Sequence, residues 1–461
     1  DGLLAFLTDA KEVDELFMVV DEELKLMSAI CPAGGRVVGP YLKPMSKVTH
    51  TEYLLEGLTE ADPRDVLRRT MFAPTVTGAP MENACAVIAR RERRPRGYYA
   101  GVMALFEPGV GGSWDLDAPI MIRTAYVSPD GDVSVPAGAT LVRHSDPLSE
   151  VAETRTKAAG VLAAIGSGAN LPDAAPPAQP PSPPAPSPAG AAPVPTLNKG
   201  ERCFFLEQGE TPPLPHADPA ALPHEIPSLR SGISRGPQGA DPAAVARDPK
   251  VAATLLYRNE RLAPFWLRPQ GAGAVPLAGM RAVVVDAADH FSQMLVHVLR
   301  RLGAQAEVAS WRDYAPGPAD LVVAGPGPGD PSGAEPRIAA LRDVIGQRLA
   351  ARAPLLAVCL SHQILARSLG LELRQLTRPH QGEQLTDELF GAPATLGYYN
   401  TFAAVAPLAA PPGVEVFRRR GTDEVIALRG PAFASLQGHP ESALSPGGVD
   451  LLARLLPAVL A

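Results

Sequence analysis

A run of proline, alanine and serine divides this chain into two parts that must fold separately. From Leu171 to Pro195 nearly every residue is one of these three types. Such a composition cannot fill a core and predicts a semi-rigid, extended spacer. We therefore predict a folded part over residues 1–168, a linker over 169–279 and a second folded part over 280–461. Near the end of the linker, the apolar pattern over 251–267 predicts a helix that docks before the second part.

The composition limits the classes of function. The chain has 461 residues, 46% of them apolar and 20% charged, as in globular proteins with more than one core. Its net charge of −7 argues against a nucleic-acid partner, and no apolar run is long enough to cross a membrane. The cysteines are widely spaced and form no CxxC pair, which predicts a reducing cytoplasm and no zinc site: Cys31, Cys85, Cys203 and Cys359. The chain begins with Asp1 and enters patterned sequence at once, so we expect further residues upstream.

Strands and helices alternate in the second part. Apolar strands are expected over residues 282–285, 320–324 and 355–358, with helical patterns following the first and the third. This order predicts a mostly parallel, doubly wound α/β sheet with helices on both faces. Ligands bind such sheets at the carboxyl ends of their strands, which is where Cys359 and the glycine-proline turn over 325–331 fall.

Cys359 stands between a buried strand and a helix, the setting of a nucleophile elbow. A helix N-terminus and a nearby imidazole activate a thiol, and His439 is the candidate base, with Glu441 two residues later to orient it. The turn over 325–331 offers amides for an oxyanion. Alone, each feature is more often structural: a core cysteine, a structural histidine, a simple turn. Together at strand ends, they favour catalysis.

These motifs resemble those of the class I, or triad, glutamine amidotransferases over the whole of residues 280–461. The similar segments are Pro-Gly-Pro-Gly-Asp-Pro at 326–331, Val-Cys-Leu-Ser-His-Gln at 358–363 and His-Pro-Glu at 439–441. The resemblance implies Cys359 as nucleophile, His439 as base and acid, and Glu441 as its orienting partner. It also implies contacts to L-glutamine or its oxyanion from Gly327, Gly329, the Leu360 amide, Gln363, Thr401 and Phe402.

The second part departs from that family at two places. Ala357 and Ser361 stand where the family elbow usually has glycine. The usual Tyr-His-Ser-Leu segment is replaced by Tyr-Asn-Thr-Phe at 399–402. These changes affect the glutamine contacts and leave the triad intact.

In the first part, acidic residues stand in an apolar and in a helical segment. Glu15 lies in the first, and Glu153 and Lys157 share one face of the second, since they are four residues apart. From periodicity alone, a surface ion pair is the favoured interpretation of Glu153 and Lys157.

Several segments of the first part resemble the C-terminal part of the α+β chorismate-utilising enzymes. These segments lie at residues 71–80, 96–101, 122–123 and 137–140. The resemblance implies two Mg²⁺ ligands, Glu15 and Glu153, and an active-site histidine, His50. It implies chorismate contacts from Thr75, Tyr99, Arg123, Gly138 and Lys157. Mg²⁺ prefers carboxylate and substrate oxygens, and Arg and Lys suit anionic groups, so the residue types fit the chemistry.

Fusion of the two parts predicts an enzyme that takes ammonia from glutamine and adds it to chorismate. Segments such as residues 142–147 and 399–403 are most similar to the phenazine-pathway branch, which makes 2-amino-2-deoxyisochorismate and keeps the enolpyruvyl group. The alternative is an anthranilate synthase, which also eliminates pyruvate. A catalytically silent scaffold is a third possibility, although the complete triad and both glutamates argue against it. The family resemblance also implies a homodimer, and it predicts that this C-terminal portion alone binds chorismate poorly.

Overall fold

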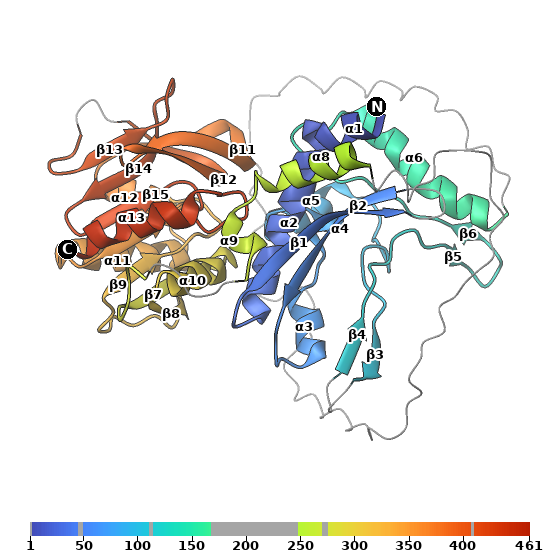
Figure 1. The fold of residues 1–461 in the computed structure, drawn as a ribbon, viewed down its shortest axis with the longest axis horizontal. Coiled ribbons are helices and arrows are strands. Elements are labelled where there is room, and N and C mark those ends of the chain that lie inside the picture. The colour runs from blue at the N-terminus through green and yellow to red at the C-terminus, as the bar shows by residue number, and fades with distance from the viewer. Residues whose placement is uncertain (1, 45–48, 110–113, 167–247, 270–274, 407–409) are drawn as a thin grey trace, which may run out of the picture.

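The computed structural model describes residues 2–44, 49–109, 114–166, 248–269, 275–406 and 410–461 (Figure 1). The predicted proline-rich spacer and Cys203 lie outside these residues. Among the helices described, none is long and apolar enough to span a membrane.

The second part is built on one mixed sheet of nine strands in the described residues. The strand order is β11-β12-β14-β15-β10-β9-β7-β8, with β13 on β14. From β15 to β8 all neighbours are parallel, whereas β11 to β15 are joined by antiparallel pairs. The strands are β7 (Arg281–Asp286), β8 (Gln305–Ser310), β9 (Leu321–Ala324), β10 (Leu355–Val358), β11 (Leu373–Leu389), β12 (Ala392–Val405), β13 (Glu415–Arg418), β14 (Glu424–Gly430) and β15 (Phe433–Leu436).

Helices cover both faces of this sheet. The helices are α10 (Phe291–Arg301), α11 (Pro336–Ala350), α12 (Leu360–Ser368) and α13 (Gly448–Leu460). One buried cluster joins α10 and α13 to alternate strand residues such as Val284 and Leu356. A second joins α11 and α12 to the residues between them, such as Val285 and Leu355. The α/β fold with a mostly parallel, doubly wound sheet is thus confirmed.

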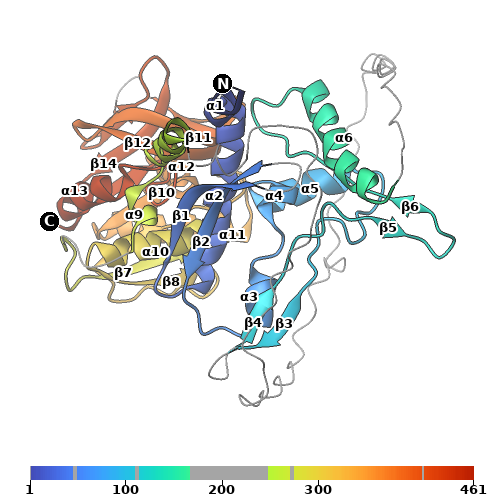
Figure 2. The same ribbon diagram turned by 45° about the vertical axis from the view of Figure 1, so that its right-hand side comes forward.

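The first part contains a long helix against a two-stranded hairpin, together with smaller elements. Helix α2 is capped by Asp9, whose carboxylate accepts the amides of Lys11 and Glu12. The elements are α1 (Gly2–Thr8), α2 (Ala10–Ile30), β1 (Gly35–Pro44), β2 (Thr49–Gly57), α3 (Pro63–Arg69), α4 (Pro74–Thr77), α5 (Met81–Arg91), β3 (Leu105–Pro108), β4 (Trp114–Asp117), β5 (Tyr126–Val127), β6 (Val133–Ser134) and α6 (Pro147–Ala164). Helix α2 contacts both strands of the hairpin and also α10 of the second part, and Figure 2 shows these elements next to one another.

The docking segment forms two helices where the sequence suggested one. They are α8 (Pro249–Asn259) and α9 (Pro264–Leu267). Pro264 starts α9, and a proline cannot continue a preceding helix because it has no amide hydrogen. Both helices contact β1 of the first part; Figure 1 shows α8 beside α1 and α9 at the boundary between the two parts.

A single apolar cluster connects the first part, the docking segment and the second part. It combines Phe17 and Leu24 of α2 with Trp266 of α9 and Phe291 of α10, all of them buried. The same cluster includes Ala443 and Leu444, just after the predicted triad. The two parts are therefore packed together through α2, which places the first part beside the cysteine site.

Candidate active sites

Cys359 occupies a strained turn between β10 and α12. Its φ of 53° and ψ of −106° are unusual for a residue with a side chain, and its amide donates to the carbonyl of Leu436 at 2.8 Å. Such conformations cost on the order of 1–3 kcal/mol and recur at functional sites. The first amide of α12, that of Leu360, has no acceptor within the helix. This is the predicted strand–turn–helix setting.

The glycine-proline turn is fastened to the elbow. Ser361, one of the two departures from the family pattern, donates its hydroxyl to the Gly325 carbonyl at 2.7 Å. A side chain at Gly327 would put its Cβ 2.7 Å from the Ala287 carbonyl oxygen and 3.1 Å from Leu360 Cδ2. Gly329 has a φ of 119°, which favours glycine. The turn and the cysteine are thus held together, and Ser361 strengthens the arrangement.

His439 and Glu441 follow β15, the strand that runs parallel to β10. Val358 and Leu436 are paired in register, so the residues after both strands emerge at one edge of the sheet. Nδ1 of His439 lies 2.8 Å from Oε1 of Glu441, and both side chains are buried. Nε2 of His439 has no hydrogen-bond partner of ordinary geometry among the described residues.

The charges at this site favour a protonated His439. Burial works to lower the pKa of His439, but Cys359 and then Glu441 outweigh it and raise that pKa well above its ordinary value. Burial also raises the pKa of the Glu441 carboxyl, against the opposing effect of His439. Cys359 acts on the pKa of His439 through a side-chain hydrogen bond as well as through its charge, so the sulfur lies beside the imidazole ring. A thiolate–imidazolium pair is the form that attacks a carboxamide.

A second histidine in the elbow sequence, His362, has a structural environment. Its Nδ1 lies 2.8 Å from the Ser435 hydroxyl and its Nε2 lies 3.1 Å from the Val425 carbonyl oxygen. The carbonyl can only accept, so Nε2 carries the proton and Nδ1 accepts from the serine. Burial lowers the pKa of His362 to about 4. This histidine is therefore neutral and committed to two bonds.

Replacing His362 with glutamine is expected to flatten the dependence of stability on pH. The unfolded chain protonates His362 below its ordinary pKa of 6.5, whereas the folded chain resists protonation down to about pH 4. Stability is thus complete above about pH 6.5 and falls as the pH decreases toward about 4. From about pH 7.5 to about pH 5, the parent should lose about 2 kcal/mol more than the variant. Urea unfolding at both pH values measures this difference, and equal losses would contradict it.

The predicted glutamine contacts separate into two groups. Gln363 is buried and donates from Nε2 to the Phe402 carbonyl at 2.7 Å and to Gln437 Oε1 at 3.0 Å. Nearby buried polar atoms have no partner among the described residues, and a ligand could satisfy them: Asn400 Oδ1, Gln437 Nε2 and Glu441 Oε2. Thr401 instead is exposed and lines a cavity that faces the first part.

Four carboxylates of the first part surround one ammonium group. Nζ of Lys11 lies 3.1 Å from Glu15 and 3.5 Å from Glu153, the two predicted metal ligands. Glu12 at 3.2 Å and Glu150 at 3.5 Å complete the group. Burial raises the pKa of the Glu15 carboxyl despite Lys11. We refer to Glu12, Glu15, Glu150 and Glu153 as the acidic cluster.

The acidic cluster has the donor chemistry of a magnesium site. No three of the described His, Cys, Asp or Glu side chains converge as a metal site in the present arrangement, because the Lys11 ammonium stands at the centre of the cluster. Glu150 Oε2 is buried without a partner. The carboxylates already surround one positive group, and one of their oxygens has no hydrogen-bond partner among the described residues. Such a set of oxygens is suited to a hard cation such as Mg²⁺. Sequence reasoning missed Glu12 and Glu150, although each stands three residues before a predicted ligand and so on the same helix face.

The predicted chorismate contacts lie close to one another. Tyr99 hydrogen-bonds the backbone of Gly138, and a Cβ at Gly138 would lie 2.7 Å from the tyrosine hydroxyl. Lys157 donates to the Gly138 carbonyl at 3.3 Å and also pairs with Glu153. Arg123 is near enough for its charge to act on Tyr99. Lys157 thus connects this group with the acidic cluster.

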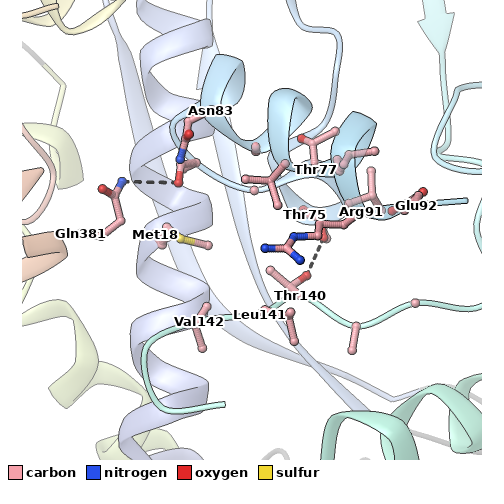
Figure 3. A pocket seen from close by; sticks show the side chains of 18 of the residues that line it. Met18, Thr75, Thr77, Asn83, Arg91, Glu92, Thr140, Leu141, Val142 and Gln381 are labelled. Atoms are coloured by element: carbon pink, nitrogen blue, oxygen red, sulfur yellow. Dashed lines mark hydrogen bonds between the residues drawn. The ribbon is translucent and has the colours of Figure 1, made fainter. Parts of the chain in front are cut away.

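A cavity of about 940 Å³ extends from this group to the second part. Thr75, Tyr99 and Gly138 line it from the first part, and Gln381 and Thr401 from the second. Thr140 donates to the Thr75 carbonyl at 2.8 Å, and Gln381 of the second part donates to the Ala79 carbonyl at 3.3 Å. Figure 3 shows Thr140 bonded to Thr75 and Gln381 extending toward the first part.

His50 does not join this group in the structure. It is exposed on β2, where it is paired with Lys43, and it is not among the residues that line the cavity. No contact found among the described residues links it to Tyr99 or to the acidic cluster. Its catalytic role stays a prediction.

Comparison with known proteins identifies two families in one chain. Residues 4–163 match the chorismate binding enzymes and residues 283–458 match the class-I glutamine amidotransferases. Two curated relatives named "Anthranilate synthase, phenazine specific", from Pseudomonas chlororaphis and Pseudomonas fluorescens, are each 39% identical over 464 residues, covering 98% of this chain. An "Anthranilate synthase" from Azospirillum brasilense is 28% identical over 97% of the chain. The chain spans 62% of each Pseudomonas relative and 50% of the Azospirillum one. The first part is therefore similar to the chorismate binding enzymes and the second part to the class-I glutamine amidotransferases, in one chain and in that order.

Proposed function

We propose that this protein aminates chorismate with ammonia from glutamine and forms 2-amino-2-deoxyisochorismate. The observation that carries this proposal is a complete Cys359–His439–Glu441 arrangement packed through α2 against a part that holds a carboxylate cluster. The phenazine-specific names of the Pseudomonas relatives favour the branch that keeps the enolpyruvyl group.

Glutamine hydrolysis follows from the residues of the second part. The Cys359 thiolate attacks the carboxamide carbon, and amides of the Leu360 and Gly327 region stabilise the oxyanion. His439 gives its proton to the nitrogen as the carbon–nitrogen bond breaks, releasing ammonia and leaving a thioester. His439 then takes a proton from water, which attacks the thioester and releases glutamate and the thiolate. Glu441 keeps Nδ1 of His439 protonated and the ring oriented.

The first part would bind and orient chorismate. Arg123 and Lys157 are suited to the anionic carboxylates, and Tyr99 with Gly138 would form one wall. Glu15 and Glu153, with Glu12 and Glu150, would hold Mg²⁺ once the Lys11 ammonium moved aside. When bound, Mg²⁺ stabilises negative charge on substrate oxygens as ammonia adds and the ring hydroxyl leaves. From the family resemblance we also infer a homodimer, and from the wide spacing of the cysteines, which form no CxxC pair, a cytoplasmic location.

The second candidate is an anthranilate synthase. The full printed name of the Pseudomonas relatives, which includes those words, and the Azospirillum relative favour it. It would perform the same amination and then eliminate pyruvate.

Product identification separates these functions. The full-length protein is incubated with chorismate, glutamine and Mg²⁺, and the products are identified by mass spectrometry. We expect an aminated product that retains the enolpyruvyl group. Anthranilate with free pyruvate would replace our proposal by the second candidate. Glutamate without any aminated product would leave the glutaminase function and remove chorismate as the acceptor.

A further inference from the structure

The turn that carries the triad glutamate is held by groups from outside its own domain. We refer to Glu441, Ser442, Ala443 and Leu444 as the triad turn. On one side, Asp21 of α2 accepts the Ser442 hydroxyl at 2.6 Å and the Ala443 amide at 2.7 Å. The carboxylate that fixes this turn is therefore supplied by the chorismate-binding part.

The docking segment fixes the triad turn from another direction. Trp266 donates its indole hydrogen to the Glu441 carbonyl at 2.8 Å, and the Ala263 amide donates to the Ala443 carbonyl at 2.7 Å. Trp266 is almost completely buried. Together with Asp21, these groups engage three successive residues, so the position of Glu441 depends on the packing of all three parts of the chain.

Asp21 also contacts the residue that packs against the catalytic histidine. The Tyr399 hydroxyl donates to Asp21 Oδ2 at 2.5 Å, and the Tyr399 ring meets His439 edge-on with centroids 5.4 Å apart. Phe291 contacts the same imidazole with centroids 4.3 Å apart. Asp21 is thus one hydrogen bond away from the triad turn and one from an aromatic wall of His439.

The bonding of Asp21 defines a single arrangement. Its side chain has no exposed surface and accepts from three donors. Ser442 Oγ accepts the Leu444 amide at 3.0 Å and donates its own hydrogen to Asp21 Oδ2. An amide in place of this carboxylate would turn one acceptor atom into a donor facing two hydroxyl groups. In the structure both carboxylate oxygens act as acceptors, and the two hydroxyl groups would lose their acceptor in the amide variant.

We propose that Asp21 is a positioning residue for glutamine hydrolysis, through which α2 sets the geometry of His439 and Glu441. The proposal rests on the proposed role of the triad and does not depend on which acceptor takes the ammonia. Glu15 of the acidic cluster lies six residues earlier on α2, about 9 Å along the helix axis. One helix consequently joins the glutaminase geometry to the chorismate-binding part.

The test compares Asp21→Asn and Tyr399→Phe in the full-length protein. Both should lower kcat for glutamate release, Asp21→Asn by about 10- to 100-fold, with a smaller effect on KM, because the histidine is misplaced and the glutamine contacts remain. The double variant should fall little below Asp21→Asn, because both changes remove one interaction. Amination of chorismate with ammonium salt in place of glutamine should be unchanged in all of them.

Tyr53→Phe is the matched control. Tyr53 of β2 donates to Asn259 Oδ1 of the docking segment at 3.0 Å, so this variant also loses one tyrosine hydroxyl and one bond between parts of the chain, away from the triad. Its glutaminase kcat should stay within about twofold of the parent. An equal loss in Tyr53→Phe, or a kcat for Asp21→Asn within twofold of the parent, would overturn the proposal, as would strictly multiplicative effects in the double variant.

The assay with ammonium salt distinguishes a failure of the proposed function from a failure of the proposed role of Asp21. If the parent uses neither ammonium nor glutamine to aminate chorismate yet still releases glutamate, the proposed function fails while the glutaminase comparison still decides the role of Asp21. A parallel loss of ammonium-dependent amination in Asp21→Asn would show general damage to α2 and overturn the positioning role. Should Asp21→Asn not fold, Tyr399→Phe, which keeps the carboxylate and the ring, decides the question by the same criteria.

Discussion

Replacing Cys359 with alanine is expected to reduce glutamine hydrolysis by about 10⁴-fold or more. The variant keeps the elbow, the glycine turn and the His439–Glu441 pair but has no nucleophile. Chorismate amination with ammonium salt should continue, because no described contact of Cys359 reaches the acidic cluster. Glutamate release and ammonium-dependent amination, measured on the same preparation, provide the comparison.

Cys85→Ala serves as the control for Cys359→Ala. Cys85 lies on α5 of the first part and is remote in sequence from the elbow, so its loss should leave glutamate release unchanged. Equal glutaminase activity in Cys359→Ala and the parent would remove the triad assignment. A loss of both activities would instead indicate that the cysteine supports the fold, since it packs in the core of the sheet.

Local sequence signals were sufficient to predict the parallel strands of the second part and to place Cys359, of the proposed triad, at a strand end. Strands β7, β9 and β10 are short, continuous apolar runs, and such runs are buried on both faces in parallel sheets. Cys359 and His439 follow two of the strands, and parallel pairing brings the ends of β10 and β15 to one edge. In this region the ends of short apolar strands are enough to locate the proposed site.

The antiparallel side of the sheet was not predicted, because its residues alternate too weakly. Strand β11 has charged or polar residues at most positions and is paired with β12 through two irregularities in register. Asp387 of β11 also forms an ion pair, at 3.3 Å, with Arg419, which follows β13. Long-range pairs of this kind leave no periodic trace in a sequence.

The role of Asp21 could not be read from the sequence for a similar reason. In the sequence it is one of three consecutive acidic residues, Asp21, Glu22 and Glu23, on an apolar helix, a pattern typical of a solvated face. In the structure the side chain is fully buried, since Tyr399, Ser442 and Ala443 approach it from about 380 to 420 residues away. A buried carboxylate is retained only with donors to match it, and those donors come from the other domain.

Replacing Glu153 with glutamine is expected to reduce ammonium-dependent chorismate amination by about 10³-fold, since a bound metal supplies several kcal/mol of charge stabilisation. Glu153 lies on α6, away from the triad turn, so glutamate release should be unchanged. Chelation of the parent with EDTA should have the same selective effect, and added Mg²⁺ should reverse it. The variant should require more Mg²⁺ for half-maximal activity, because one of four carboxylates has lost its charge.

Glu56→Gln is the matched control for this test, because an exposed ion pair with Arg36 contributes at most about 1 kcal/mol and lies outside the acidic cluster. Its chorismate activity and its Mg²⁺ requirement should equal those of the parent. If Glu153→Gln behaves like Glu56→Gln and EDTA has no effect, the acidic cluster is an ion-pair network around Lys11 and not a metal site. If only the chorismate activity falls, the carboxylates act in the chorismate site and not in glutamine hydrolysis. The two reactions then use separate sets of residues, although α2 contributes residues to both sites.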